Sequence, residues 1–253
     1  MPTIQAVVFD VFGTLFHNEQ ELWHKTFERL VQEQKLSVEP MQLYTAWRAV
    51  EGGFRRRRVD TKSMTLALPF ETYEQAWVAA TRQVFKDLNL NGDANRAVRM
   101  FLDALASRPM FFDVRPTFDA LRGKYKLGVL SNADNFYLNG VLNSSGLRKE
   151  VHAVLCSENA KAYKPMPSLF FAILSKLGVA PDAAVYVGDT PLEDVLGPQR
   201  VGMRAVWLNR ASASGGHTPG DPSPDAEIHT LTELPGVLAE LEMRPAAHAA
   251  EVR

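Results

Sequence analysis

The sequence predicts an α/β fold in which a parallel sheet carries a helical insertion after its first strand. Three short apolar runs, at 4–9, 127–130 and 184–187, are bounded by Gly, Ser, Asn or Asp, as buried parallel strands often are. Between Leu15 and Arg108 the apolar residues instead recur at helical spacing. Strands that alternate with helices indicate crossover connections, which produce a parallel sheet.

The insertion contains two apolar stripes and no strand-like run. Each stripe includes a tryptophan, and a stripe of this composition packs into a core more often than it binds a ligand. We therefore predict that Trp23 and Trp77 are packing residues. The first stripe consists of Leu22, Trp23, Phe27, Leu30 and Val31, and the second of Trp77, Ala80, Thr81, Val84, Phe85 and Leu88.

Two weaker strands are predicted downstream of the insertion, at 151–155 and 204–208, each after a stretch of helical period. The segment 211–226 is rich in Gly, Ser and Pro and is predicted to be an exposed loop. A short closing helix is predicted at 234–243.

These elements divide the chain into two parts and a tail. Residues 1–16 and 109–243 are predicted to form the core that contains the sheet, and residues 17–108 to form a helical cap. Residues 244–253 are predicted to be a flexible tail.

The composition argues against several classes of function. The 28 Lys and Arg residues nearly balance the 29 Asp and Glu residues, and a net charge of −1 produces no field that attracts nucleic acid or an anionic membrane. The single cysteine allows no internal disulfide, and no apolar run approaches the ~20 residues that span a bilayer. The N-terminal stretch MPTIQAVVFD lacks the features of a signal peptide. We therefore expect a cytoplasmic monomer or homodimer that acts on a small anionic molecule.

Polar side chains follow four of the predicted strands. Because ligands bind at the carboxyl ends of the strands in an open parallel sheet, we expect these side chains to meet in one crevice. Any one of them is explained equally well as a helix cap, but four in this order indicate a functional site. They are Asp10 after the first strand, Ser131 and Asn132 after the second, Lys164 in the loop after the third, and Asp189 and Asp194 after the fourth.

Three carboxylates in one crevice need compensating charge, and Lys164 supplies only one unit of it. Without more, Asp10, Asp189 and Asp194 raise one another's pKa and become partly protonated. All the candidate ligands carry oxygen, which favours Mg²⁺ over zinc. We predict that Asp10, Asp189 and the backbone carbonyl of Phe12 bind the ion directly, with Asp194 further from it.

Four motifs resemble those of the haloacid dehalogenase-like hydrolase superfamily. They are D-V-F-G-T at 10–14, S-N at 131–132, Y-K-P at 163–165 and G-D-T-P-L-E-D at 188–194. Each motif is weak alone, but the ordered set is specific, and the resemblance covers residues 7–210. It implies a Rossmann-like core, a helical cap inserted after the first motif, and a nucleophilic role for Asp10.

The resemblance also implies a covalent mechanism. Asp10 attacks the substrate and forms an aspartyl intermediate that water later hydrolyses. Ser131 and Lys164 hold the oxygens of the transferred group, and Mg²⁺ neutralises the charge between nucleophile and phosphoryl group. Asn132 and Thr14 are predicted to assist substrate binding, Thr14 by supporting the first loop, although its hydroxyl fits an ordinary helix N-cap equally well.

Phe12 departs from the phosphatase pattern. Phosphatases of this superfamily carry a second Asp at that position, which protonates the leaving alkoxide and later activates water. A benzyl side chain does neither, and positioned acid–base catalysis contributes ~10²–10⁴-fold. We therefore expect ordinary phosphomonoesters to be poor substrates.

Three functions remain compatible with the sequence. We favour a Mg²⁺-dependent phosphohydrolase, because the neighbouring carboxylates of Asp189 and Asp194 need a cation to offset their charge. His17 and Glu19 are the nearest candidates in sequence to replace the missing acid, although both are better explained as solvent-facing residues. The first alternative is a metal-independent 2-haloacid dehalogenase, in which halide leaves without a proton and an aromatic residue occupies the position of Phe12. The second is a binding protein that has lost catalysis.

Substrate choice is expected to come from the cap. The run of four arginines at 55–58 cannot form one binding face, because successive helical residues point about 100° apart. A solvated basic patch explains the run best, with at most one or two arginines in reach of an anionic substrate. Arg48, next to Trp47, is predicted to bind a carboxylate or phosphate tail. Cys156 is predicted to be a small buried side chain and not a nucleophile.

Overall fold

The computed structural model describes residues 3–210 and 222–243, and it confirms the α/β fold. Six strands form one parallel sheet in the order β5-β4-β1-β6-β7-β8. All the predicted strands are present, and the edge strand β8 is an addition. The strands are β1 (Ala6–Phe9), β4 (Lys126–Ser131), β5 (Ala153–Cys156), β6 (Ala184–Gly188), β7 (Arg204–Leu208) and β8 (Ala226–Ile228).

Both faces of the sheet are buried, which explains why its inner strands read as continuous apolar runs. In β1, Val7 and Phe9 belong to the apolar cluster on one face, and Ala6 and Val8 to the cluster on the other. The first face packs against α5 (Val114–Leu121), α6 (Asn135–Ser144) and α10 (Leu234–Met243), and the second against α8 (Pro167–Leu177). Helix α10 has the bounds predicted for the closing helix.

Short helical turns complete the core. Helix α7 (Ser157–Ala160) follows β5, and a π-helical turn (Pro191–Leu196) leads from β6 into α9 (Gly197–Gln199). Three 3₁₀ turns lie at Leu147–Lys149, Pro181–Ala183 and Leu231–Glu233. After β4, β5 and β6 a helix or helical turn begins within four residues, which keeps the polar residues that follow these three strands close to the sheet.

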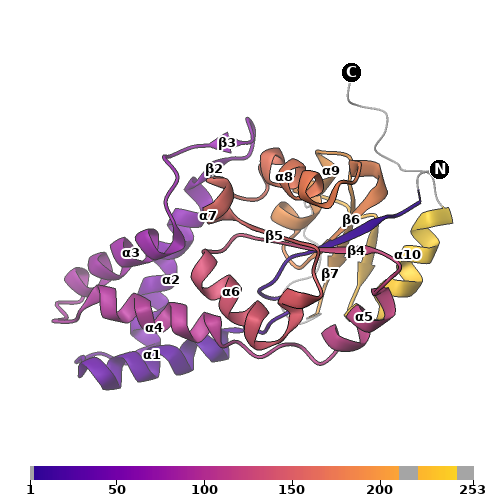
Figure 1. Cartoon of the computed structure of the whole chain (residues 1–253). Coiled ribbons are helices and arrows are strands. Elements are labelled where there is room, and N and C mark those ends of the chain that lie inside the picture. The colour runs from indigo at the N-terminus through magenta and orange to yellow at the C-terminus, as the bar shows by residue number, and fades with distance from the viewer. Residues whose placement is uncertain (1–2, 211–221, 244–253) are drawn as a thin grey trace.

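Four helices of the insertion gather to one side of the sheet, as Figure 1 shows. They are α1 (Gln20–Gln34), α2 (Pro40–Arg57), α3 (Tyr73–Asp87) and α4 (Ala94–Ala106). The rings of Trp23, Trp47 and Trp77 pack together, with centroids between 5.5 and 5.9 Å apart. Trp23 and Trp77 are therefore buried packing residues, as predicted, but both also line a cavity.

The prediction that the insertion holds no strand is wrong. Strands β2 (Val59–Asp60) and β3 (Thr65–Leu66) pair antiparallel in a small hairpin between α2 and α3. Two residues per strand are too few to produce a visible period of two, so the sequence pattern does not reveal them.

The predicted loop at 211–226 lies mostly outside the described residues, and its last residue, Ala226, begins β8. The predicted tail at 244–253 lies wholly outside them. Within residues 3–210 and 222–243, none of the helices combines the length and the apolar character that a membrane span requires.

Candidate active site

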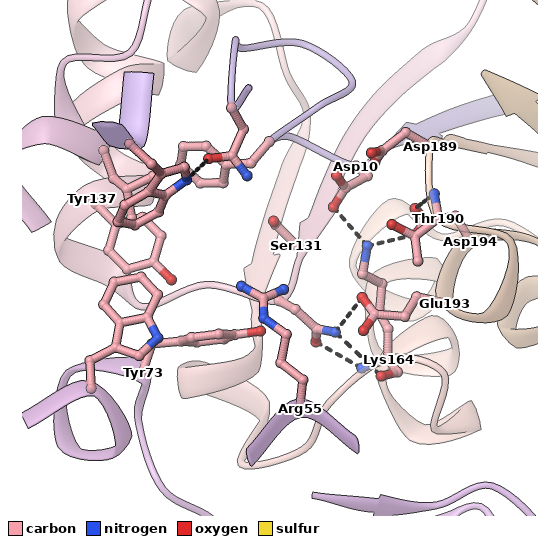
Figure 2. Close-up of a pocket in the computed structure, with 16 residues that line it drawn as sticks. Asp10, Arg55, Tyr73, Ser131, Tyr137, Lys164, Asp189, Thr190, Glu193 and Asp194 are labelled. Atoms are coloured by element: carbon pink, nitrogen blue, oxygen red, sulfur yellow. Dashed lines mark hydrogen bonds and ion pairs between the residues drawn. The ribbon is translucent and has the colours of Figure 1, made fainter. Parts of the chain in front are cut away.

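A cavity of about 500 Å³, part of it open to solvent, lies at the carboxyl ends of the central strands. Asp10 directly follows β1, Ser131 ends β4, and Asp189 directly follows β6. Lys164 enters from the segment between α7 and α8. The structure thus brings residues of the four predicted motifs to one cavity, as Figure 2 shows.

The ammonium of Lys164 is the central charge of this cavity. The side chain is 1% exposed, and its Nζ donates to Asp10 Oδ1 at 2.7 Å and to Asp194 Oδ1 at 2.6 Å. It also donates to the hydroxyl of Tyr186 at 3.1 Å. Burial opposes the charge on this amine, but Asp10 and Asp194 outweigh burial and hold the pKa of Lys164 well above its usual value. Lys164 is therefore a fixed cation beside the Asp10 carboxylate.

Asp189 completes an acidic cluster with Asp10 and Asp194. One carboxylate oxygen from each of the three lies within 4.8 Å of the others. The loop after β1 passes so close that a Cβ on Gly13, whose φ is +95°, would lie 2.8 Å from the carboxylate carbon of Asp189. Thr14 Oγ1 donates to Asp189 Oδ1 at 3.4 Å. Thr14 therefore links the first loop to the acidic cluster.

The acidic cluster fits a hard divalent cation. Burial and the charges of Asp10 and Asp194 raise the pKa of Asp189 well above its ordinary value, and burial raises the pKa of Asp194 to about 7. Lys164 and the backbone N–H of Thr190 occupy the two oxygens of Asp194. Asp10 and Asp189 are therefore better placed than Asp194 to bind a cation directly.

An aromatic wall faces the acidic cluster across the cavity. It consists of Phe12, Trp23, Tyr73, Trp77 and Tyr137. The ring of Phe12 packs against that of Tyr137, with centroids 5.4 Å apart. The side chain at position 12 therefore gives this part of the cavity an apolar surface and no proton donor.

Ser131 and Asn132 differ in what they offer a ligand. Ser131 faces the cavity in Figure 2. Asn132 instead accepts a hydrogen bond from the backbone N of Lys164 at 2.8 Å, and its amide donates to Glu193 Oε2 at 2.8 Å. Asn132 thus lines the cavity and also ties three loops together. Both ends of its amide are engaged in these bonds, and its contact with substrate stays a prediction.

Glu193 and Arg58 form a contact between core and insertion that the sequence did not reveal. Arg58, which directly follows α2, is 3% exposed and forms an ion pair with Glu193. Arg58 also donates to the hydroxyl of Tyr73. Burial alone would raise the pKa of Glu193, but Arg58 and Lys164 hold it below its ordinary value. Glu193 therefore stays ionised at the edge of the cavity.

The structure corrects the prediction for Arg48, which does not line the cavity. Its side chain is 46% exposed and donates to Glu51 Oε2 at 2.8 Å. Arg55 lines the cavity instead, while its Nε donates to the other oxygen of the same buried Glu51. Figure 2 shows the Arg55 guanidinium reaching toward Ser131. One arginine of the run at 55–58 thus reaches the cavity.

His17, Glu19 and Cys156 do not line the cavity. His17 Nδ1 lies 2.7 Å from Glu19 Oε1, and neither residue is part of the cavity lining. Cys156 is fully buried, and burial raises the pKa of its thiol to about 11. A thiol with so high a pKa is a poor nucleophile, which agrees with the structural role predicted for Cys156.

Comparison with known proteins places this geometry in one family. The sequence model of the haloacid dehalogenase-like hydrolases matches residues 4–202. Haloacetate dehalogenase H-2 from Moraxella sp. (strain B) is 26% identical over 91% of this chain and 99% of its own length. Phosphoserine phosphatase from Thermus thermophilus is 32% identical over 63% of this chain and 66% of its own.

A solved structure shares the complete fold. The HAD-hydrolase YfnB from Bacillus subtilis, bound to magnesium, matches 94% of this chain and 99% of its own with a TM-score of 0.77 and 18% identity. The family resemblance of the four motifs is confirmed by these matches. Relatives of two reaction types, dehalogenase and phosphatase, match the chain.

Proposed function

The chain belongs to the haloacid dehalogenase-like hydrolase family, and we propose that it is a Mg²⁺-dependent phosphohydrolase with Asp10 as nucleophile. The acidic cluster of Asp10, Asp189 and Asp194 carries this proposal. Among the described residues that line the cavity, four are carboxylates and two are cationic, Arg55 and Lys164. Arg58 pairs with one of the four, Glu193, so negative charge is in excess when Asp10, Asp189 and Asp194 are all ionised. This excess repels an anionic substrate unless a cation is bound.

In the proposed reaction, a carboxylate oxygen of Asp10 attacks the phosphorus atom of the substrate. An O–P bond to Asp10 forms while the bond from phosphorus to the leaving oxygen breaks. The Ser131 hydroxyl and the Lys164 ammonium stabilise the oxygens of the transferred group. Water then attacks the aspartyl phosphate, which releases inorganic phosphate and restores Asp10.

Asp10, Asp189 and the backbone carbonyl of Phe12 are the proposed ligands of Mg²⁺. Both oxygens of Asp194 already accept hydrogen bonds, from Lys164 and from the backbone N–H of Thr190, so we assign Asp194 a place further from the ion. When bound, the cation supplies positive charge that offsets the repulsion between the Asp10 carboxylate and an anionic phosphoryl group.

Phe12 restricts the proposed substrates by their leaving group. With no acid at this position, a leaving alkoxide has to take its proton from water. Acyl and aryl phosphates avoid this difficulty because their leaving groups are stable as anions. Alkyl phosphates, which depend on the acid, are expected to react about 10²–10⁴-fold more slowly.

The variant Phe12→Asp tests this reasoning. It introduces the missing acid and is expected to raise kcat/KM for glycerol phosphate by roughly 10²-fold, with little change for acetyl phosphate. Phe12→Asn is the matched control, because it has the same shape and polarity without the acid. EDTA is expected to abolish both activities. No Mg²⁺-dependent phosphate release from acetyl phosphate or p-nitrophenyl phosphate would refute the phosphohydrolase.

A 2-haloacid dehalogenase is the second candidate, and the aromatic wall around Phe12 favours it. In that reaction Asp10 displaces halide from carbon, and halide needs no proton to leave. Phe12 is then no disadvantage. Chloride release from 2-chloropropionate in EDTA, without phosphate release from acetyl phosphate, supports this candidate. A protein that is inactive with both substrates and holds a ligand tightly is the binding protein of the third alternative.

We further propose that Arg55 contacts the substrate, in the role predicted for Arg48. The buried Glu51 carboxylate fixes its Nε, and the guanidinium then reaches into the cavity. Arg55→Ala is expected to raise KM about tenfold, because a charge-assisted contact to an anion is lost. Arg57→Ala is the matched control, since Arg57 is exposed and does not line the cavity. Equal KM values for the two variants would remove Arg55 from the site.

A further inference from the structure

The first backbone N–H groups of α3 donate to a carboxylate from the loop that follows Ser131. Asp134 follows in that loop and is 5% exposed. Its Oδ1 accepts a hydrogen bond from the backbone N of Tyr73 at 2.9 Å, and its Oδ2 accepts one from the backbone N of Glu74 at 2.8 Å. These are the first two N–H groups of α3, which have no partner inside their own helix. A core residue thus completes a helix of the insertion.

Asp134 is free to bond to α3 because a second carboxylate, that of Glu158, accepts a hydrogen bond from the first N–H group of α6. Asp134 occupies the N-cap position of α6, but its side chain makes no hydrogen bond to that helix. Instead, Glu158 Oε2 accepts from the backbone N of Asn135 at 2.7 Å and from its side chain at 2.9 Å. At α3, the next N–H, that of Gln75, donates to the Thr72 hydroxyl at 3.1 Å. Both helix starts are therefore satisfied only while Asp134 points at α3.

Helix α3 carries two side chains of the cavity wall, Tyr73 and Trp77. Its Tyr73 hydroxyl accepts from Arg58, Arg58 pairs with Glu193, and Glu193 accepts from Asn132. Figure 2 shows Tyr73 across the cavity from Glu193. Two separate routes, one through Asp134 and one through Arg58, therefore join the same helix to the loop of Ser131 and Asn132.

We infer that Asp134 is a positioning residue, whose ionised carboxylate holds α3 and its cavity-lining side chains against the Ser131 loop. A carboxylate has two acceptor oxygens for the two N–H groups of Tyr73 and Glu74. A protonated acid or an amide has one carbonyl acceptor and turns a donor toward the other N–H group. Only the ionised form satisfies both contacts.

The surroundings of Asp134 give this contact a pH dependence. Burial raises the pKa of Asp134 to about 6, and the charges of Glu158 on α7 and Glu74 on α3 add to the rise, whereas the two N–H groups oppose it. Tyr137 of α6 and Cys156 of β5 also face the group, and burial raises the pKa of both, so they stay neutral. We therefore expect α3 to loosen as the pH falls through about 6.

Stability and positioning respond to this ionisation with opposite signs. The folded pKa of about 6 lies above the ordinary value of 3.8. Ionisation between these values therefore lowers the free energy of unfolding, although it forms the contact to α3. An Asp134→Asn variant removes the charge, so it is expected to keep its Tm near neutral pH while it loses the second contact to α3. If Asp134 only stabilised the fold, the variant would lose both Tm and the contact to α3.

Hydrogen exchange measured by mass spectrometry tests the inference without a substrate. At about pH 8, Asp134→Asn is expected to lower the protection of the first amides of α3 about tenfold, which corresponds to one lost charge-assisted hydrogen bond. Peptides from α4 serve as the internal control. In the wild type, the same protection is expected to fall as the pH is lowered through about 6, after correction for the intrinsic exchange rate.

Glu158→Gln supplies a control of opposite sign. It keeps an acceptor for Asn135 but removes a negative charge near Asp134, so the midpoint of the protection loss is expected to move to lower pH. Equal α3 protection in wild type and Asp134→Asn would overturn the inference, and so would loss of protection that only accompanies a lower Tm.

A kinetic measurement, which alone rests on the proposed phosphohydrolase, adds a second readout. With p-nitrophenyl phosphate, Asp134→Asn is expected to raise KM by roughly tenfold and to change kcat less, because the cavity wall moves while the nucleophile stays in place. An unchanged KM would count against the positioning role. Absence of turnover in the wild type counts against the phosphohydrolase alone, since the exchange experiment is unaffected.

Discussion

Replacing Lys164 with Met is the most severe single change that the site predicts. Methionine fills a similar volume but removes the ammonium that lies 2.7 Å from Asp10 and 2.6 Å from Asp194. Both carboxylates lose their cation at a position where Lys164 is 1% exposed. Removing one partner of a buried ion pair typically costs about 3–5 kcal/mol, because the other charge stays buried and unpaired.

The expected loss is large enough to measure by thermal unfolding. For 253 residues, an unfolding entropy of about 2.1 cal/mol/K per residue converts this free energy into a Tm lower by about 6–9 °C. The loss is expected to depend on pH with a definite sign. Burial raises the pKa of Asp194 to about 7, so in mild acid this carboxyl is protonated with or without Lys164. The Tm difference is therefore largest at about pH 8 and narrows at about pH 5.

Differential scanning calorimetry in EDTA, with wild type and variant at both pH values, measures this effect. Lys176→Met is the matched control, because Lys176 is exposed on α8. The double variant Lys164→Met, Asp194→Asn is expected to regain part of the lost Tm, since it removes one of the two unpaired charges. An unchanged Tm for Lys164→Met at about pH 8, or a Tm difference from the wild type that grows in acid, would refute the buried ion pairs of Lys164 with Asp10 and Asp194.

Three further outcomes are expected. Mg²⁺ is expected to raise Tm more at about pH 8 than at about pH 5, because cation binding requires ionised carboxylates and the pKa values of Asp189 and Asp194 are raised. Calorimetry with Mg²⁺ and with EDTA measures the difference. Equal Tm shifts at both pH values would count against the metal site. Gly13→Ala forces a Cβ toward Asp189 at a φ of +95°, so it is expected to lower the free energy of unfolding by about 1–3 kcal/mol and to remove the Mg²⁺-dependent rise in Tm. If the variant shows a rise of wild-type size, the close approach of Gly13 to Asp189 is contradicted. Asp113→Asn costs about 3–5 kcal/mol near neutral pH, because it breaks the buried pair with Arg210. Burial raises the pKa of Asp113, but Arg210, the backbone N–H of Leu231 and the Thr230 hydroxyl outweigh burial and hold it below its ordinary value. The stability that Asp113 contributes is therefore present above the ordinary value and is lost as the pH falls through the folded pKa; urea unfolding across this range checks the sign.

The sheet and the acidic cluster could be predicted because short-range patterns determine them. A strand buried on both faces needs a continuous apolar run, and 4–9, 127–130 and 184–187 show it. Asp10 directly follows the first run and Asp189 follows the third after one intervening residue, so both stand at carboxyl ends of strands. The structure pairs β1 with β6, which brings the two side chains together. The short strands β2, β3 and β8 escaped prediction because two or three residues carry no readable period.

The choice between Arg48 and Arg55 could not be made from the sequence. Seven residues are nearly two helical turns, so both arginines point to the same side of α2, and helical period cannot separate them. They differ by about 10 Å along the helix axis, and only the packing of α2 against the core decides which end meets the cavity. Glu51, which lies between them and binds both, looks like an ordinary surface residue in the sequence.

The sequence by itself determined the α/β fold and the convergence of Asp10 with the other acidic residues, because these depend on residues beside strands whose ends converge in any parallel sheet. The nucleophilic role proposed for Asp10 came from the resemblance of the four motifs. Only the tertiary structure decided how the insertion is joined to the core. Asp134 occupies the N-cap position of α6 and Glu158 lies in the first turn of α7, yet the side chain of each accepts hydrogen bonds from the start of another helix. Such an exchange depends on where separate elements come to lie, and no local pattern records that placement.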